Sequence, residues 1–408
     1  MSPGGGRLPT WGRLRAFVRR YDRRLWVLFA VQLIVSVGFG AAMPFVGLYL
    51  YEELGVSMRI VGTIMLVAAL AGSAAQILGG EIADRIGRRP LIAWTMGIRA
   101  AVFLLMAYVV SIRASYLIVA AVFLGIRFVG AMNQPAISSM VADIVPRERR
   151  VEAFGILRIG GNAGWALGPA IGGFLIAVSY ASLFTLTAVA SVIGLVIILL
   201  LAPESIRARE TEHFSLGRLL DAARDRPFLS FCGASLLLFL VMGQFGSTLS
   251  VYSTSFLGIS TAQLGFVYTL NGAIVVFFQW PAALFGKRIG IRRTLVLGAL
   301  LFAAGYFSVG IVPGFGFLMG SMVVITLGEI LFSPSATSTV AELAPVGRTG
   351  RYMGLFGLSQ AFGWSGGPFI GGWLLDAYGR TPIVLWGAIA GIGIAAAAWF
   401  LVDRRRTD

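Results

Sequence analysis

Residues 80–90 read Gly-Glu-Ile-Ala-Asp-Arg-Ile-Gly-Arg-Arg-Pro, and they form a short polar connector between two long apolar stretches. A degenerate copy, Gly-Lys-Arg-Ile-Gly-Ile-Arg-Arg, occupies residues 286–293 between two further apolar stretches. Gly87 permits a positive φ angle that other residues rarely adopt, so the connector is typical of a tight turn between two helices. Its presence in both halves of the chain predicts a duplicated architecture.

The duplication extends outward from this connector. At an offset of 203 residues, the identical pairs include Gly40 with Gly243, Tyr49 with Tyr252 and Gly62 with Gly265. Further along, the offset becomes 199, and residues 168–169 and 367–368 are both Gly-Pro. The offset changes between the third and fourth apolar stretches of each half, where an outer loop can shorten at little cost. Parallel repeats of this kind are a transporter architecture.

The composition is that of a membrane protein. The chain of 408 residues is 57% hydrophobic and only 12% charged, whereas a soluble domain carries about 25% charged residues. A spanning helix needs about 20 mostly apolar residues, and alternating β-barrel segments are not seen. Twelve such stretches lie roughly at 25–50, 60–82, 91–111, 115–140, 153–176, 182–201, 228–251, 263–285, 294–312, 316–340, 352–375 and 382–402. We predict an all-α membrane protein with 12 transmembrane helices in two pseudo-symmetric six-helix bundles.

The polar stretch between the two repeats sets the expected domain organisation. We expect a basic cytoplasmic N-terminal arm at 1–24, an N-terminal six-helix bundle at 25–202, a cytoplasmic linker at 203–227, a C-terminal six-helix bundle at 228–402 and a cytoplasmic tail at 403–408.

The distribution of positive charge predicts how the chain lies in the membrane. The formal net charge is +15, and with a cytoplasmic N-terminus 27 of the 33 Lys and Arg fall on the cytoplasmic side. Only Arg59, Arg113 and Arg380 fall in outer loops. This is the positive-inside bias, so the basic arm is interpreted as a topology signal in contact with lipid headgroups, not as a nucleic-acid tail. Both termini are expected to be cytoplasmic.

The sequence contains no pattern typical of catalysis or cofactor binding. It has one cysteine, Cys232, and one histidine, His213, so neither a disulfide framework nor a cluster with metal-ligand spacing is expected. No nucleophile motif or phosphate loop is found. We therefore expect no enzyme, cofactor or metal. We also expect the chain to be a monomer.

The connector at 80–90 closely resembles the signature loop between helices 2 and 3 of the major facilitator superfamily. The resemblance implies that the loop stabilises the outward-open state, with Asp84 near Arg348 and Arg351, and Arg88 near Asp143. An anchoring loop without a switching role is the alternative. The expected gate residues are Gly80, Asp84, Arg85, Gly87, Arg88, Arg89, Asp143, Arg348 and Arg351.

A second motif lies in the fifth apolar stretch, Gly164-Trp-Ala-Leu-Gly-Pro-Ala-Ile-Gly-Gly173. It resembles the antiporter motif of the 12-helix drug:proton antiporter families of this superfamily, at Gly164, Gly168, Pro169, Gly172 and Gly173. Gly and Pro in one helix permit close packing and a bend. Because the eleventh stretch carries the same pattern at 363–372, part of it can belong to the repeat scaffold.

Ionisable residues within a span are functional candidates by default. Glu329 is the only carboxylate deep within a predicted span, and Arg127 lies in a stretch with a partial resemblance to the helix 4 motif linked to proton transfer. The repeat aligns Arg127 with Thr326 and Gly130 with Glu329, so the two charged groups lie one turn apart in depth. We predict that Glu329 binds the coupling proton and Arg127 tunes it. A static interhelical ion pair is the equal alternative.

The helices expected to line the cavity carry few polar groups and many aromatic ones. Such pockets suit lipophilic ligands, and the expected substrate-cavity residues are Gln32, Phe39, Asn133, Gln244, Phe245 and Thr248.

These features together predict a secondary active transporter that exports a lipophilic or drug-like small molecule in exchange for protons by alternating access. The expected partners are this substrate, protons and membrane lipids, in a bacterial cytoplasmic (inner) membrane. A uniporter or symporter for a metabolite, a lipid exporter and a non-transporting membrane receptor are the alternatives.

Overall fold

The computed structural model describes residues 18, 20–146, 149–205, 224–311, 313–345 and 348–402. The arm at 1–24, the linker at 203–227 and the tail at 403–408 therefore lie wholly or largely outside the described residues. The first half comprises α2 (Arg23–Leu48) with the π-helical turn η1 (Tyr49–Glu53), α3 (Met58–Ile86), α4 (Arg88–Ser111), α5 (Tyr116–Ile144), α6 (Arg150–Ile176) and α7 (Tyr180–Leu201).

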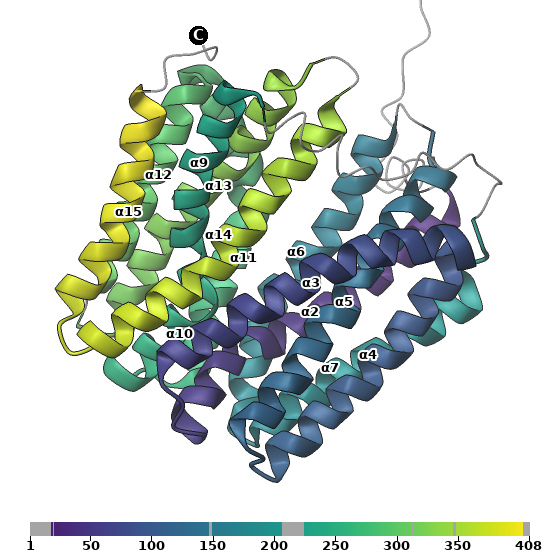
Figure 1. Cartoon of the computed structure of the whole chain (residues 1–408), viewed down its shortest axis with the longest axis horizontal. Coiled ribbons are helices and arrows are strands. Elements are labelled where there is room, and N and C mark those ends of the chain that lie inside the picture. The colour runs from purple at the N-terminus through teal and green to yellow at the C-terminus, as the bar shows by residue number, and fades with distance from the viewer. Residues whose placement is uncertain are drawn as a thin grey trace, which may run out of the picture.

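The second half follows the same order. It comprises α9 (Arg226–Met242), η3 (Gly243–Gly246), α10 (Thr248–Val251) and η4 (Tyr252–Phe256), then α11 (Thr261–Ile289), α12 (Ile291–Val309), α13 (Phe315–Leu343), α14 (Thr349–Tyr378) and α15 (Pro382–Val402). The described residues are helical in two bundles, which Figure 1 shows side by side. The predicted all-α fold is confirmed.

The repeat read from the sequence is reproduced in the helix boundaries. Helix α11 has the bounds of α3 shifted by 203 residues, and α13 has those of α5 shifted by 199. The turn residue Gly87 has a φ of 105°, and its counterpart Gly290 has a φ of 90°. Both lie in the left-handed region that favours glycine. The symmetry therefore extends to individual turns.

The seventh span differs from the continuous helix predicted for 228–251. It is interrupted at η3, where Gly243 and Gly246 lower helix stability. The break leaves backbone groups to be satisfied, and Tyr268 Oη donates to the Phe245 carbonyl oxygen at 2.7 Å. The equivalent α2 is unbroken. One half of the repeat therefore has an irregular backbone where the other has a regular helix.

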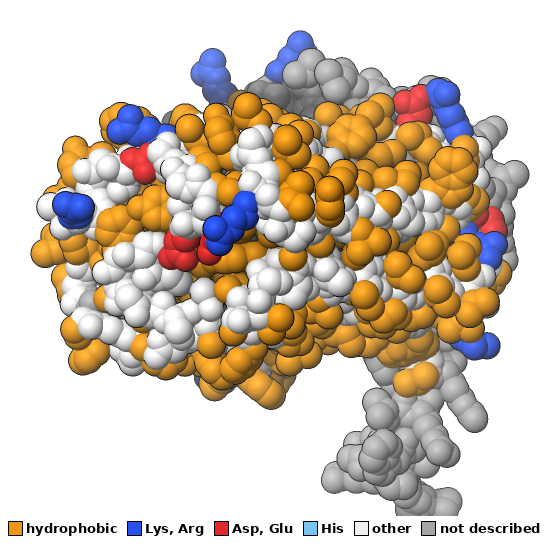
Figure 2. Space-filling view, turned by 90° about the horizontal axis from the view of Figure 1, so that it is seen from below, with side chains coloured by type: hydrophobic (Ala, Val, Ile, Leu, Met, Phe, Trp, Pro, Cys, Tyr) orange, Lys and Arg blue, Asp and Glu red, His pale blue; other side chains and the backbone are white. Residues whose placement is uncertain are grey.

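The surface and the helix composition fit a lipid environment. Ten of the described helices are long and apolar enough to cross a membrane. Helices α6 and α14, which carry the Gly/Pro pattern, are not among them. Large apolar side chains are exposed around the molecule, for example Trp94 and Phe277. Figure 2 shows extensive apolar surface with only scattered charged groups.

The two halves meet along two symmetry-related contacts, α6 with α11 and α3 with α14. We call this contact the seam. The inner end is the end with the Gly87 and Gly290 turns, and the outer end is where α2 ends and α3 begins. In Figure 1 the halves cross near α10, at the outer end. Every described hydrogen bond between the halves lies toward that end, for example Ser250 Oγ to the Pro44 carbonyl oxygen at 3.0 Å.

Candidate substrate and proton site

A cavity of about 340 Å³ lies between the two halves, beside the seam. Both bundles contribute to its wall, and most of the wall is apolar or aromatic. Its aromatic residues are Phe39, Phe123, Trp165, Phe245, Tyr268, Phe302, Tyr306 and Trp364. Its charged residues are Arg127, Arg158 and Glu329. A mostly apolar pocket with a few polar groups is typical of small-molecule sites.

The wall contributed by the first half is cationic. Arg127 on α5 and Arg158 on α6 both line the cavity, and neither has a hydrogen bond or ion pair within the described residues. Arg99 on α4 lies one layer behind. It is 8% exposed and sits over the rings of Phe39 and Phe103, at 5.2 and 5.4 Å from the guanidinium carbon.

The wall contributed by the second half is acidic and hydrogen-bonded. The Asn271 amide on α11 donates to Glu329 Oε2 at 2.9 Å and to Thr326 Oγ1 at 3.0 Å. Thr326 donates in turn to the Met322 carbonyl oxygen at 2.7 Å. Tyr306 also lines this wall; it is fully buried, and its hydroxyl has no hydrogen-bond partner among the described residues. The Asn271 amide therefore positions one oxygen of the Glu329 carboxylate.

The structure places Arg127 and Glu329 on the wall of one cavity, but they do not form an ion pair with each other. Arg158 lines the same cavity, and it forms no ion pair with Glu329 either. The static Arg127–Glu329 pair is thus not formed in this conformation. The proton-coupling roles of the two residues remain a prediction.

The predicted substrate-cavity residues divide into two groups. Phe39 and Phe245 line the cavity. Gln244 and Thr248 are fully buried beside Gly371 of α14, and Gln244 Nε2 donates to the Gly367 carbonyl oxygen at 2.9 Å. Gln32 donates to Ser36 at 3.3 Å, and Asn133 is 7% exposed; neither is among the lining residues. In this conformation none of these four polar residues lines the cavity.

The glycines of the antiporter-like motif lie where α6 packs closely on its neighbours. A Cβ added at Gly164, Gly168 or Gly172 would meet the backbone or side chains of α2, and one at Gly173 would meet the backbone of α11. Pro169 lines the cavity. The equivalent Gly363, Gly367, Gly371 and Gly372 of α14 pack in the same way on the seventh span and on α3. The glycines therefore serve close packing in both halves.

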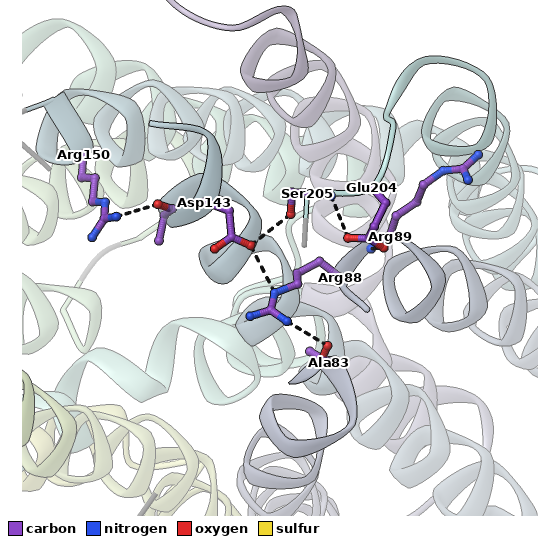
Figure 3. Close-up of polar contacts among 8 residues, drawn as sticks. Ala83, Arg88, Arg89, Asp143, Arg150, Glu204 and Ser205 are labelled. Carbon is purple, nitrogen blue, oxygen red and sulfur yellow. Dashed lines mark hydrogen bonds and ion pairs between the residues drawn. The ribbon is translucent and has the colours of Figure 1, made fainter. Parts of the chain in front are cut away.

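The connector at the inner end ties the first bundle together (Figure 3). Arg88 Nε lies 3.3 Å from Asp143 Oδ2, and Ser205 Oγ donates to the same oxygen at 3.1 Å. The Arg89 backbone N–H donates to Glu204 Oε2 at 3.1 Å, and its guanidinium donates to the Leu199 carbonyl oxygen at 2.7 Å. These contacts join α3 and α4 to the ends of α5 and α7.

The remaining gate residues are only partly described. The side chain of Asp84 lies outside the described residues, so its contact with Arg348 and Arg351 stays a prediction. Arg348 is exposed and Arg351 is half-buried. Arg85 forms an ion pair with Glu81 on its own helix. Gly80 has room for a Cβ, which would approach only the Pro135 side chain at 3.9 Å.

At the outer end, Asp376 of α14 caps the first turn of α3 in the other half. Its carboxylate accepts the backbone N–H groups of Met58 and Arg59, both at 2.9 Å. A carboxylate at a helix N-terminus is favoured by the helix dipole. The Arg59 guanidinium lies 3.7 Å from the same carboxylate and over the ring of Trp373. This outer latch holds the two halves together.

Sequence reasoning missed Arg158, Asn271, Tyr306 and Asp376 as site residues. The repeat alignment contained a signal for two of them, since Arg158 aligns with Gly357 and Asn271 with Ala68. A polar residue whose repeat partner is apolar or absent marks a place where the halves differ in chemistry.

Comparison with known proteins agrees with this architecture. The sequence model of the Major Facilitator Superfamily matches residues 28–277 and 234–408. A nucleoside transporter, NupG, superposes with a TM-score of 0.78 at 17% identity, covering 94% of this chain and all of the other. A POT family transporter in complex with a thioalcohol-conjugated peptide gives a TM-score of 0.77, with 93% and 96% coverage. These two likenesses concern the fold.

The chain also has curated relatives over most of its length. An uncharacterized MFS-type transporter, YttB of Bacillus subtilis, is 27% identical over 94% of this chain and 96% of the relative. The multidrug resistance protein MdtH of Aeromonas salmonicida is 29% identical over 92% and 94% of the two chains. With the family match, the paired bundles and the cavity between them, the chain belongs to the major facilitator superfamily and is a multi-pass membrane transporter.

Proposed function

We propose that the chain exports an amphiphilic small molecule from the cytoplasm in exchange for protons, by alternating access. The observation that carries the proposal is Glu329, the one carboxylate on the described cavity wall. An ionisable side chain inside a membrane span is costly and is kept for function. A carboxylate open to the cavity can exchange a proton with either side of the membrane as the seam opens and closes.

The direction of transport rests on the relatives and on charge. The MdtH proteins are named for multidrug resistance, which supports efflux across a bacterial inner membrane. The basic inner end supports cytoplasmic termini by the positive-inside bias. With that orientation, the outer latch and the closed seam make this an inward-facing conformation, in which the cavity receives substrate from the cytoplasmic side.

The transport cycle follows from the symmetry of the seam. When the outer contacts of α3 with α14 and of α6 with α11 separate, rocking of one rigid bundle against the other can bring the inner ends together. The Arg88–Asp143 contact keeps the first bundle rigid during this motion. Arg348 and Arg351 at the inner end then become available to Asp84. Glu329 releases its proton inward and receives another from outside.

The test is transport by the purified protein in proteoliposomes, with an imposed pH gradient. The probes are three fluorescent ring compounds: naphthoate, naphthylmethylamine and aminomethyl-naphthoate. Exchange of probe without a gradient reports movement of the halves, and gradient-driven accumulation reports coupling. We expect the wild type to perform both and Glu329→Gln to retain exchange while losing the response to the gradient.

Glu342→Gln is the matched control, because Glu342 is the other carboxylate of α13 and is exposed away from the cavity. It should behave as the wild type. Gradient-driven accumulation that survives in Glu329→Gln would contradict the proton role. Exchange that ignores the gradient in the wild type as well would identify a uniporter.

A further inference from the structure

The charges of the cavity are separated by half. Three arginines lie within spans of the first half, at 99, 127 and 158, and the second half has none at comparable depth. The single carboxylate deep within a span, Glu329, belongs to the second half. The arginines and Glu329 belong to different bundles. The cavity therefore has a cationic wall on the side of the first half and an acidic wall on the side of the second half.

The arginines of the cationic wall form no ion pair within the described residues. Arg127 and Arg158 face the cavity without an ion-pair partner in the described chain, and Arg99 behind them is enclosed by aromatic rings. Arg158 is exposed and Arg127 is half-buried, so a ligand in the cavity can reach both guanidinium groups. An arginine guanidinium is also well suited to a planar carboxylate, which it can bind through two hydrogen bonds.

The acidic wall also has unused hydrogen-bonding capacity. Asn271 uses its amide hydrogens on Thr326 and Glu329, which leaves the second Glu329 oxygen without a described partner. The fully buried Tyr306 hydroxyl nearby has no partner either. A cationic amine on a ligand would find a carboxylate and a hydroxyl here. Between the two walls, the aromatic residues surround an apolar body.

From this polarity we infer that the transported molecule is an amphiphilic zwitterion, with its acidic group on Arg127 and Arg158 and its amine on Glu329. This inference rests on the proposed function and names its substrate class. It also explains coupling. A bound amine competes with the proton for Glu329, as exchange requires, whereas a purely anionic ligand would favour protonation of Glu329 and so travel with the proton.

Equilibrium binding to the detergent-solubilised protein tests the inference without any gradient. The same three compounds form a matched series: naphthoate has only the acid, naphthylmethylamine only the amine, and aminomethyl-naphthoate has both at opposite ends of the ring system. We expect aminomethyl-naphthoate to bind about tenfold or more tightly than either singly charged compound, as one additional charged hydrogen-bonding pair would produce.

Variants assign each end of the ligand. Arg158→Gln and Arg127→Gln should reduce the affinity for aminomethyl-naphthoate to near that for naphthylmethylamine, and should not weaken binding of the amine compound. Glu329→Gln should reduce it to near that for naphthoate and should not weaken binding of naphthoate. Arg288→Gln and Glu342→Gln, exposed outside the cavity, are the matched controls and should change nothing.

Three results would overturn the inference: equal affinity for the amine and the zwitterion, equal affinity for the acid and the zwitterion, or no binding of any of the three. A different result would contradict the proposed function, namely gradient-driven accumulation that persists in Glu329→Gln. If the protein exchanges naphthylmethylamine for protons but binds it as tightly as aminomethyl-naphthoate, the proposed function stands and the inference of a zwitterionic substrate is wrong.

Discussion

The seam and the cavity wall show opposite uses of the same repeat. Along the seam the halves are copies of each other: Gly173 packs on α11 as Gly372 packs on α3. On the cavity wall, a few residues away, the halves differ, because Arg158 aligns with a glycine of the other repeat and Asn271 aligns with an alanine. The symmetric part is suited to close packing between the halves, and the asymmetric part to chemistry.

Breaking the seam should have the largest effect. A Cβ at Gly272 would lie 2.4 Å from Ala166 of the other half, so Gly272→Leu overpacks the seam when the halves are closed at this point. Overpacking costs roughly 1–3 kcal/mol, which shifts the equilibrium between open and closed about 5- to 150-fold. The readout is alkylation of a Ser365→Cys cavity cysteine by an impermeant maleimide from the outer side.

Two features of the chain limit background labelling and provide a matched control. The native Cys232 is buried, and Gly391→Leu on α15 places the same side chain where nothing lies within 4 Å. We expect labelling to accelerate in Gly272→Leu and to remain slow in Gly391→Leu. Equal labelling rates in the two variants would show that the seam does not close the outer end.

Altering the asymmetric wall should have an intermediate effect. Asn271→Leu removes the donor that orients Glu329, and a hydrogen bond to a charged group contributes about 1.5–3 kcal/mol. We expect gradient-driven accumulation to fall about tenfold, with exchange without a gradient largely retained. Asn271→Gln keeps the amide and should retain more coupling. A parallel loss of exchange and coupling in Asn271→Leu would indicate a packing role instead.

Weakening the outer latch should have the smallest effect. Asp376→Asn removes the charge at the α3 N-terminus, which is worth about 0.3–1 kcal/mol. A rise of about two- to fivefold in the labelling rate of the Ser365→Cys cysteine follows. The control is Glu53→Gln, because Glu53 pairs with Arg113 at 3.0 Å within one half. If Asp376→Asn labels no faster than this control, the latch does not hold the outer end.

Much of the fold was predictable from local patterns. Helix lengths and the Gly87 turn follow from apolar runs and one glycine, and the boundaries of α11 and α13 repeat those of α3 and α5. The break at η3 was not predicted, because a continuous apolar run hides a break that is stabilised by Tyr268 from another helix. Such tertiary compensation has no local signal.

The candidate site was only partly predictable. Glu329 and Arg127 could be identified because a charge within an apolar span is conspicuous. Which residues share the cavity with Glu329 depends on how the helices of the two halves pack, and the structure adds Arg158 of α6 to its wall. Gln244 was expected on the cavity, but it hydrogen-bonds to α14 within its own half. A polar residue on a helix can satisfy a neighbouring backbone as readily as a ligand.

The central claim is that Glu329 carries the coupling proton and exchanges it for substrate. The most direct test is proton release when aminomethyl-naphthoate is added to the purified protein in weakly buffered solution, followed with a pH indicator. We predict release approaching one proton per protein for the wild type and Glu342→Gln, and none for Glu329→Gln. Equal release from the wild type and Glu329→Gln would contradict the account.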